Sequence, residues 1–452
     1  MRQVGSSFKV VLWLGLFSAA AALAQETTTP IKHIMFLMQE NHSFDNYFGT
    51  YPKADGIPPG TCIPEDPFDP SNKACVKPWR IGTDEDVEMD DPDHSEQTSV
   101  LQFNEGKMDG FVYALNIRNQ DGRLAMAYYD DRELPYYWNI ADEYVLFDRF
   151  FSSAAGGSFI NHLYWVAAAP GEDGGRNTQE VLAETPTIFD RLQEKGISWK
   201  FYVQNYDPEL NYRTVHLYEG NRASQVIWVP LLNFDRFLDN PELSKHIVNM
   251  DTYYDDLANG TLPAVAFMVP SGPSEHPPGS VRSGQRFVKS LLQSLMQSSY
   301  WESSAFIWSY DDWGGWYDHV PPPQVDAFGY GFRVPALMVS AYAKPGYIDS
   351  TTLDYTSVLK FIEDNWQLEP LAERDAKANS IANAFDFSAG PRAAKFLPFE
   401  RESNVAKPEP KRIVIYLAYG AGLLLAGSIF VIAMLRADLG PRGLPEEDWG
   451  IQ

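Results

Sequence analysis

The sequence predicts an α/β fold built on a mostly parallel central sheet. Six short apolar runs recur along the chain, and the first, residues 34–38, is continuously apolar rather than alternating. A continuous run fits a strand buried on both faces, as in a parallel sheet. Polar clusters follow four of these runs directly. Because ligands of open α/β sheets bind beyond the carboxyl ends of the strands, we expect the functional site at that edge.

The other elements follow from local patterns. Further strands are predicted at 144–151, 197–203, 265–269, 305–310 and 334–342. Helices are predicted at 124–143, 163–169, 283–298 and 356–366. Residues 49–100 form a loop-rich excursion, and residues 204–260 lack clear periodicity and are interpreted as an insertion or cap near the site. Residues 25–388 are expected to form one catalytic domain.

The first 24 residues have the pattern of a secretory signal. Arg2 and Lys9 precede or flank an apolar run, and Ala22-Leu23-Ala24 supplies a small-residue cleavage pattern. A first membrane helix that is never removed is the alternative. In an exported protein, Cys62 and Cys75 are expected to form one disulfide that closes a short loop. Two free buried thiols are the alternative.

An uncharged run of 23 residues, 413–435, has the length needed to span a bilayer, which takes roughly 20 residues. It predicts a C-terminal transmembrane helix, after a linker at 389–412 and before a short tail at 436–452. A buried core helix is the alternative. With a signal at the other end, the expected location is an extracytoplasmic catalytic domain anchored by this single helix.

The overall charge limits the class of partner. The formal net charge is −24. This argues against nucleic acid, which binds basic surfaces. An anionic substrate remains compatible if a local cation and histidines offset the acidic field.

Two carboxylate-rich clusters predict a metal site. Glu40 and Asn41 follow the first strand, and Asp311 and Asp312 follow the strand at 305–310. Paired carboxylates after a buried strand are costly unless a cation neutralises them, although two exposed loop aspartates are the alternative. Carboxylate and amide oxygens form a hard-cation site, so we expect one divalent metal ion of unspecified identity.

A serine and several histidines accompany these clusters. Ser158 follows paired glycines at a turn into a helix, where backbone amides favour an anion, although an N-cap role is also open. His276 follows the strand at 265–269, and His319 follows Asp312 by a few residues. Serine can attack phosphorus, and histidines can bind phosphate oxygens or move protons. His94 follows an acidic run that either binds a cation or is solvated loop.

Several motifs, in order, resemble those of the bacterial phosphoesterase family, which holds phospholipases C and the related acid phosphatase A. Glu40-Asn41-His42-Ser43-Phe44-Asp45 is similar to its ENRSFD-type opening. The other similar elements are Asp93-His94, Lys107-Met108-Asp109-Gly110-Phe111, Tyr128-Tyr129, Leu134-Pro135, Asp148-Arg149-Phe150-Phe151, Glu275-His276-Pro277, Gly284-Gln285 and Asp311-Asp312-Trp313-Gly314-Gly315-Trp316-Tyr317-Asp318-His319-Val320. Each element alone is weak, but the ordered set over about residues 30–366 is specific.

The resemblance implies an alkaline-phosphatase-like fold, a three-layer α/β/α sandwich. It implies metal-dependent hydrolysis of phosphoric esters through a serine nucleophile, of the acid phosphatase or phospholipase C type. It assigns the metal to Glu40, Asn41, Asp311 and Asp312, and catalysis to Ser158, His276 and His319. It assigns substrate phosphate to His94, Asn161 and His162.

Two positions, 162 and 158, bear on these assignments. His162 stands where the family usually has arginine, so it could replace a basic phosphate contact. Ser158 follows the acid phosphatase branch, because the phospholipase C branch usually has threonine there, whereas the predicted anchor favours a lipid headgroup. The alternatives are a sulfatase-like hydrolase, which lacks support from a formylglycine motif, and an inactive membrane-anchored protein that binds phosphate or lipid headgroups.

Overall fold

The computed structural model of the 452-residue chain describes residues 26–82, 90–171, 182, 184–271, 274–401 and 412–437. The chain divides into two compact units, Met1–Arg401 and Glu402–Gln452. The predicted signal at 1–24 lies outside the described residues, as do residues 402–411 of the predicted linker and residues 438–452 of the predicted tail.

An eight-stranded sheet forms the centre of the first unit, in the order β12-β6-β11-β10-β1-β9-β7-β8. Five of its strand pairs are parallel, and β11 runs antiparallel to both β10 and β6. All six predicted strands are present in it. Its strands are β1 (His33–Gln39), β6 (Val145–Phe147), β7 (Trp199–Val203), β8 (Ile247–Asn249), β9 (Val265–Val269), β10 (Ser304–Tyr310), β11 (Ala336–Ser340) and β12 (Tyr347–Asp349).

The two outermost strands were not predicted. β8 and β12 have three residues each, and such short runs carry little periodicity. β8 lies inside the segment 204–260, so that segment contributes an edge strand to the central sheet as well as covering elements.

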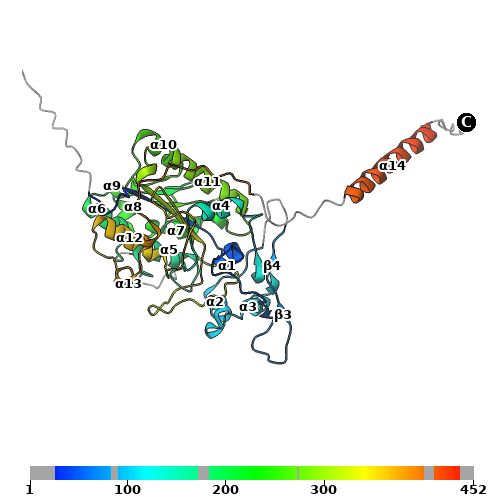
Figure 1. The fold of residues 1–452 in the computed structure, drawn as a ribbon, viewed down its shortest axis with the longest axis horizontal. Coiled ribbons are helices and arrows are strands. Elements are labelled where there is room, and N and C mark those ends of the chain that lie inside the picture. The colour runs from blue at the N-terminus through cyan, green and yellow to red at the C-terminus, as the bar shows by residue number, and fades with distance from the viewer. Residues whose placement is uncertain are drawn as a thin grey trace, which may run out of the picture. The chain divides into compact units, whose positions relative to one another are not determined.

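Helices lie on both faces of the sheet, which gives the expected α/β/α layering (Figure 1). On one side α5 contacts α6, α7 and α12, and on the other α11 contacts α4 and α10. The α-helices of this unit are α1 (Phe44–Phe48), α2 (Glu96–Phe103), α3 (Phe111–Asn116), α4 (Pro135–Glu143), α5 (Ser158–Ala167), α6 (Ile188–Lys195), α7 (Gln225–Trp228), α8 (Asp235–Asp239), α9 (Pro241–Ser244), α10 (Asp251–Asn259), α11 (Val281–Gln297), α12 (Tyr355–Trp366) and α13 (Glu373–Lys377).

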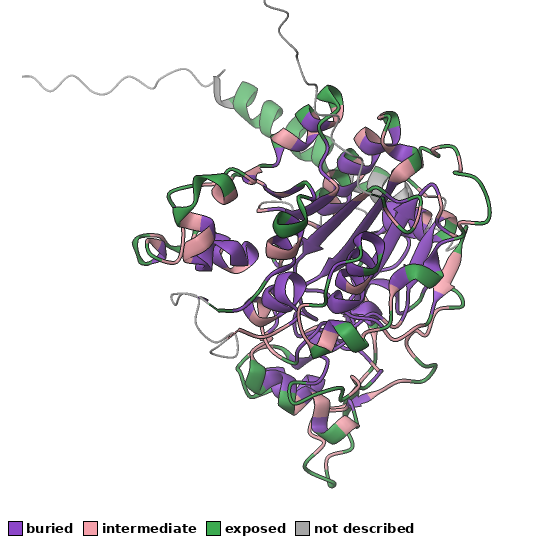
Figure 2. Ribbon diagram, turned by 90° about the vertical axis from the view of Figure 1, so that its left-hand side faces the viewer, coloured by how far each residue is buried: buried purple, intermediate pink, exposed green. Residues whose placement is uncertain are grey.

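The core explains this layering. The sheet strands are almost entirely buried, whereas exposed residues gather on the outer helices and loops (Figure 2). The helix predicted at 124–143 is shorter than expected, because α4 begins only at Pro135, a residue suited to the first helical position. Before it, Ala127–Tyr128 form β5, which pairs with β4 (Trp79–Arg80).

The loop-rich excursion is closed by the predicted disulfide. Cys62 and Cys75 are bonded, with their Cα atoms 5.4 Å apart. The bond joins the short pair β2 (Ile63–Pro64) and β3 (Cys75–Val76). The alternative of two free thiols is thereby excluded.

The predicted transmembrane helix at 413–435 requires correction. The second unit contains α14 (Arg412–Ala437), yet among the described residues no helix combines the length and apolarity needed to cross a membrane. The predicted location, anchored to a membrane by this helix, loses its support in the same way.

Candidate active site

Two neighbouring strands bring the predicted metal ligands together. β1 and β10 pair in parallel with Gln39 opposite Tyr310, so the residues that follow each strand meet at the same sheet edge. The Asn41 backbone N–H donates to Asp311 Oδ1 at 3.2 Å. Asn41 has φ 63°, a left-handed conformation that asparagine tolerates better than most residues. This sharp turn keeps its side chain beside the carboxylates.

Burial makes these carboxylates electrostatically costly. Glu40 is 3 % exposed, and Asp311 and Asp312 are completely buried. Burial, followed by the nearby charge of Asp311, holds the pKa values of Glu40 and Asp312 well above those of ordinary carboxyl groups. Several carboxylates in one dry site need a compensating cation if they are to stay ionised.

The residues present fit a divalent cation. Asn41 Oδ1 and Asp311 Oδ2 are buried and make no hydrogen bond. Buried polar atoms without partners are rare in folded proteins and call for a bound group. Both atoms are oxygen donors of the type that hard cations prefer. Glu40, Asn41, Asp311 and Asp312 could therefore hold such an ion.

Ser158 is the first residue of α5 and points toward this cluster. Its Oγ donates a hydrogen bond to Asp312 Oδ2 at 3.4 Å. The preceding residue, Gly157, is the N-cap and provides no side-chain cap. The first amides of α5 therefore remain available to a phosphate oxygen beside the serine.

Asn161 supports this turn. Its Oδ1 accepts from the Ala154 backbone N–H at 2.9 Å, and its Nδ2 donates to the Ala154 and Gly156 carbonyls at 3.2 and 3.1 Å. The amide is thereby occupied within the segment that leads to Ser158. The structure brings the predicted residue to the site, but its contacts position the turn rather than face the cavity.

His94 and His276 lie beside each other, with ring centroids 5.9 Å apart. His94 Nδ1 is 2.8 Å from the Pro92 carbonyl oxygen, and its Nε2 is 3.1 Å from Asn41 Nδ2. Burial lowers the pKa of His94, but the carboxylates of Asp312 and Asp91 outweigh it and raise the pKa to about 9. In the neutral ring Nε2 can accept from the Asn41 amide and hold it in place, whereas the protonated ring would instead carry positive charge suited to a phosphate.

A cavity of about 470 Å³ opens onto these groups. Glu40, Ser158 and His276 all line it. Its other walls come partly from the 204–260 segment, through Ser224, Ile227 and Trp228, in agreement with a covering role for that segment. A predicted ligand, the predicted nucleophile and a predicted proton-transfer group therefore face one space.

His162 lies at the metal cluster rather than at the cavity wall. It is fully buried in α5, and its Nε2 is 3.4 Å from Glu40 Oε1 and 3.8 Å from Asp311 Oδ2. Burial lowers its pKa to about 4, and Asp311 and the Trp228 backbone offset this only in part. A neutral ring between two carboxylates is poorly suited to the phosphate contact that the sequence suggested.

His319 is not brought to this group of residues. Its Nδ1 is 2.7 Å from Asp45 Oδ2 and its Nε2 is 3.3 Å from Asp55 Oδ1. Both ring nitrogens thus face carboxylates of a separate network that includes Arg333. These contacts give His319 a structural environment, and its predicted catalytic role gains no geometric support.

Glu275, next to His276, is a supporting residue that the sequence did not assign. It is fully buried and accepts hydrogen bonds from Tyr47, Tyr137 and Tyr310 hydroxyls and from the Gln39 amide. Burial raises the pKa of Glu275 to about 7, although these hydrogen bonds lower it in part. The network ties the His276 loop to β1, α4 and β10. No spacing in the sequence could reveal it, because its donors come from separate elements.

The paired glycines after Asp312 permit a close approach, which leads to a prediction. Gly314 has φ 62°, and an added Cβ would lie 2.3 Å from the Asn41 carbonyl oxygen. We expect Gly314→Ala to displace Asn41 and to lower the hydrolysis rate about 10²-fold, the usual effect of misplacing a catalytic group by ~1 Å. Steady-state rates would check this.

The matched control is Gly390→Ala, since an added Cβ at Gly390 meets no atom within 4 Å. That variant should keep the parent rate. Equal rates for both variants would contradict the packing argument.

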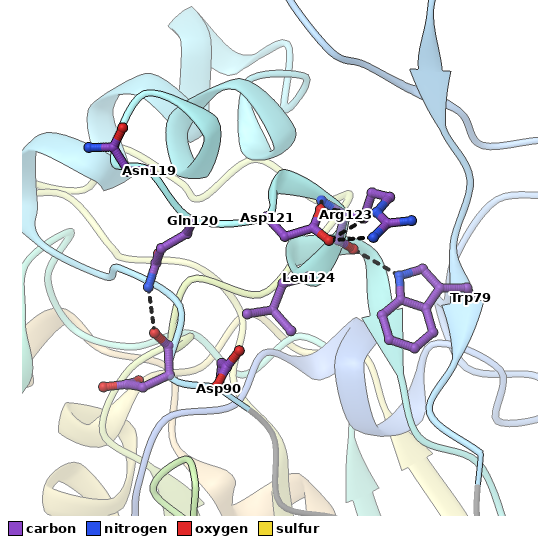
Figure 3. A pocket seen from close by; sticks show the side chains of 8 residues that line it. Trp79, Asp90, Asn119, Gln120, Asp121, Arg123 and Leu124 are labelled. Atoms are coloured by element: carbon purple, nitrogen blue, oxygen red, sulfur yellow. Dashed lines mark hydrogen bonds and ion pairs between the residues drawn. The ribbon is translucent and has the colours of Figure 1, made fainter.

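A second and larger cavity lies beside the site. It has a volume of about 820 Å³ and is lined by Trp79, Asp90, Asp91, Asn119, Gln120, Asp121, Arg123 and Leu124 (Figure 3). It carries none of the predicted nucleophile, metal or proton-transfer groups. Asp91 lines both cavities, so the larger one adjoins the catalytic space.

Comparison with known proteins identifies the family of the chain. A sequence model of the Phosphoesterase family matches residues 31–369. The chain is 30 % identical to "Phospholipase C B" of Mycobacterium tuberculosis over 81 % of this chain and 80 % of that protein. It is 28 % identical to "Non-specific phospholipase C1" of Arabidopsis thaliana, over 80 % of this chain and 72 % of that protein.

Solved structures resemble the chain only weakly. An alkaline phosphatase superfamily protein from Vibrio parahaemolyticus is 15 % identical, with a TM-score of 0.32, over 51 % of this chain and 60 % of that one. The fold is therefore assigned from the strand order and layers of this structure and not from these similarities. On the extent of the family match and of the similarity to phospholipases C, the chain belongs to the phosphoesterase family and is a phosphoric ester hydrolase.

Proposed function

We propose that the protein hydrolyses phosphoric esters with the help of one divalent metal ion and a serine nucleophile, Ser158. The observation that carries this proposal is the meeting of Glu40, Ser158 and His276 at one cavity, with Ser158 Oγ 3.4 Å from Asp312. The family membership supplies the reaction class. The positions of the residues suggest which of them acts as nucleophile, proton donor and metal ligand.

The proposed path is a double displacement. Ser158 Oγ forms a bond to phosphorus, and its proton passes to Asp312. The bond from phosphorus to the leaving oxygen breaks, and His276 gives that oxygen a proton. Water then attacks the phosphorus bound to Ser158, and His276 takes the proton of that water. Asp312 returns the first proton to Ser158 as the product leaves, which is a phosphomonoester from a phospholipid and phosphate from a phosphomonoester.

Charge stabilisation accompanies both displacements. A divalent ion on Glu40, Asn41, Asp311 and Asp312 would neutralise negative charge that develops on the phosphoryl oxygens. The α5 amides next to Ser158 and the charged His94 are placed to bind the remaining oxygens.

The substrate class is proposed to be a phospholipid headgroup ester, because the similar proteins are named phospholipases C. The adjoining cavity offers space for a part of the substrate beyond its phosphate. The second candidate is a phosphomonoester, which is favoured by serine rather than threonine at position 158.

Parallel assays on the full chain separate these substrates. Phosphate release from a soluble aryl phosphate would be compared with phosphocholine release from phosphatidylcholine micelles. Phosphocholine release that exceeds phosphate release supports the phospholipase C assignment. Phosphate release alone would overturn it in favour of a phosphatase, and neither release would overturn the proposed activity on both.

Metal dependence gives a prediction for Asp312. Dialysis against a chelator should abolish hydrolysis, and adding back a divalent ion should restore it. Asp312→Asn should lower metal affinity at least ~10-fold, because even partners of metal ligands cost about that much when changed. Metal content measured by mass spectrometry, together with rates, would check this. Full metal content with full activity would remove Asp312 from the site.

A further inference from the structure

His162 is an unusual buried histidine. Its side chain has no exposed surface, and neither ring nitrogen makes a hydrogen bond that satisfies both distance and angle, although the Trp228 backbone lies beside the ring. A buried imidazole normally pairs both nitrogens with protein groups or water. The ring therefore has an unused ligand atom within the protein interior.

Carboxylate oxygens of two neighbouring residues lie close to Nε2. Glu40 Oε1 lies 3.4 Å away and Asp311 Oδ2 lies 3.8 Å away. Asp311 Oδ2 and the nearby Asn41 Oδ1 are also buried without hydrogen bonds. Ligand atoms of Glu40, His162 and Asp311 can all lie within 4.8 Å of one another. The imidazole nitrogen and the carboxylate oxygens of two residues thus lie close enough to bind one ion.

We propose that His162 is itself a ligand of the divalent ion, through Nε2, and that it makes the site prefer a first-row transition metal over calcium or magnesium. This inference rests on the proposed metal dependence and adds both a ligand and a metal class to it. The phosphate contact expected for residue 162 is then replaced by a metal contact.

The spacing agrees with shared coordination. Two ligand atoms at about 2.0–2.1 Å from one metal lie roughly 3–4 Å from each other, depending on the angle between them. The distances from His162 Nε2 to Glu40 Oε1, 3.4 Å, and to Asp311 Oδ2, 3.8 Å, both fall in this range. Imidazole suits zinc, iron, copper and nickel, whereas all-oxygen sites suit magnesium and calcium, so a nitrogen donor here changes the preference.

The direct test is pulsed EPR of the full chain after metal removal and loading with one equivalent of Mn²⁺. Mn²⁺ accepts both oxygen and nitrogen ligands, and a bound imidazole gives a ¹⁴N modulation of the echo. The wild type should show this modulation, and His162→Gln and His162→Asn should lose it. Zn²⁺ affinity, measured by competition, should fall at least ~10-fold in both variants, while Ca²⁺ affinity changes less.

Two matched histidine changes complete the design. His216→Gln alters an exposed histidine and should retain the modulation. His94→Gln alters the histidine that contacts Asn41 and should retain it as well, which assigns the nitrogen to residue 162. Using two substitutions at 162 keeps the test valid if one of them folds poorly.

The possible results distinguish failure of the His162 assignment from failure of the proposed metal-dependent hydrolysis. Bound Mn²⁺ without ¹⁴N modulation, or with modulation that survives both 162 variants, overturns the His162 ligand and leaves metal-dependent hydrolysis standing. Failure of the wild type to bind any divalent ion, with hydrolysis unaffected by chelators, overturns the metal site as a whole.

Discussion

Ser158→Ala should lower the hydrolysis rate by about 10⁴-fold or more, the order of loss seen when a serine nucleophile is removed from a hydrolase. The reason is that Oγ is the atom proposed to form the covalent bond to phosphorus, and alanine offers no replacement. Its hydrogen bond to Asp312 is long, at 3.4 Å, so the fold should not depend on it. Initial rates with a phosphate ester would measure the loss.

The control for this change is Ser290→Ala on α11, an exposed serine that contacts Tyr254. It should hydrolyse at the parent rate. Circular dichroism and metal content should remain the same in both variants. A Ser158→Ala protein that hydrolyses as fast as Ser290→Ala would end the nucleophile assignment.

Arg333→Met should lower the free energy of unfolding by about 3–5 kcal/mol, the usual cost of leaving buried charges without their partner. The guanidinium is completely buried. It donates to Asp318 Oδ1 at 2.9 Å and Asp45 Oδ1 at 3.2 Å, and to the Asp55 and Asp148 carbonyls at 2.7 Å each. Methionine fills similar volume but leaves two buried carboxylates uncompensated.

Urea unfolding of Arg333→Met would be compared with that of Arg213→Met. Arg213 also pairs with two carboxylates, Asp235 and Asp239, but its side chain is 41 % exposed. Solvent screens such pairs, so this variant should change stability far less. Similar losses for the two variants would contradict a special role for the buried pair.

The centre of the fold was predictable because its strands are apolar on both faces. Residues 265–269 form β9 with the predicted bounds, and the clusters after β1 and β10 lie together as expected. The edge strands β8 and β12 escaped prediction because they have three residues each and, unlike the equally short β6, do not lie within a longer apolar run.

Within the site, the order of the motifs along the chain identified the residues but not the groups that their side chains face. Asn161 faces the turn before Ser158, His162 faces Glu40 and Asp311, and His319 faces Asp45 and Asp55. These orientations depend on the rotation of α5 and on where separate loops meet. Only three-dimensional packing fixes them, so a motif could name these residues without assigning their partners.

The stereochemical course at phosphorus tests the central claim most directly. The substrate would be an isotopically chiral phosphorothioate ester, hydrolysed in isotopically labelled water by the metal-loaded protein. Two successive in-line displacements, first by Ser158 and then by water, give net retention of configuration, which is the predicted result. Net inversion would mean a single attack by water on the ester and would contradict a serine nucleophile.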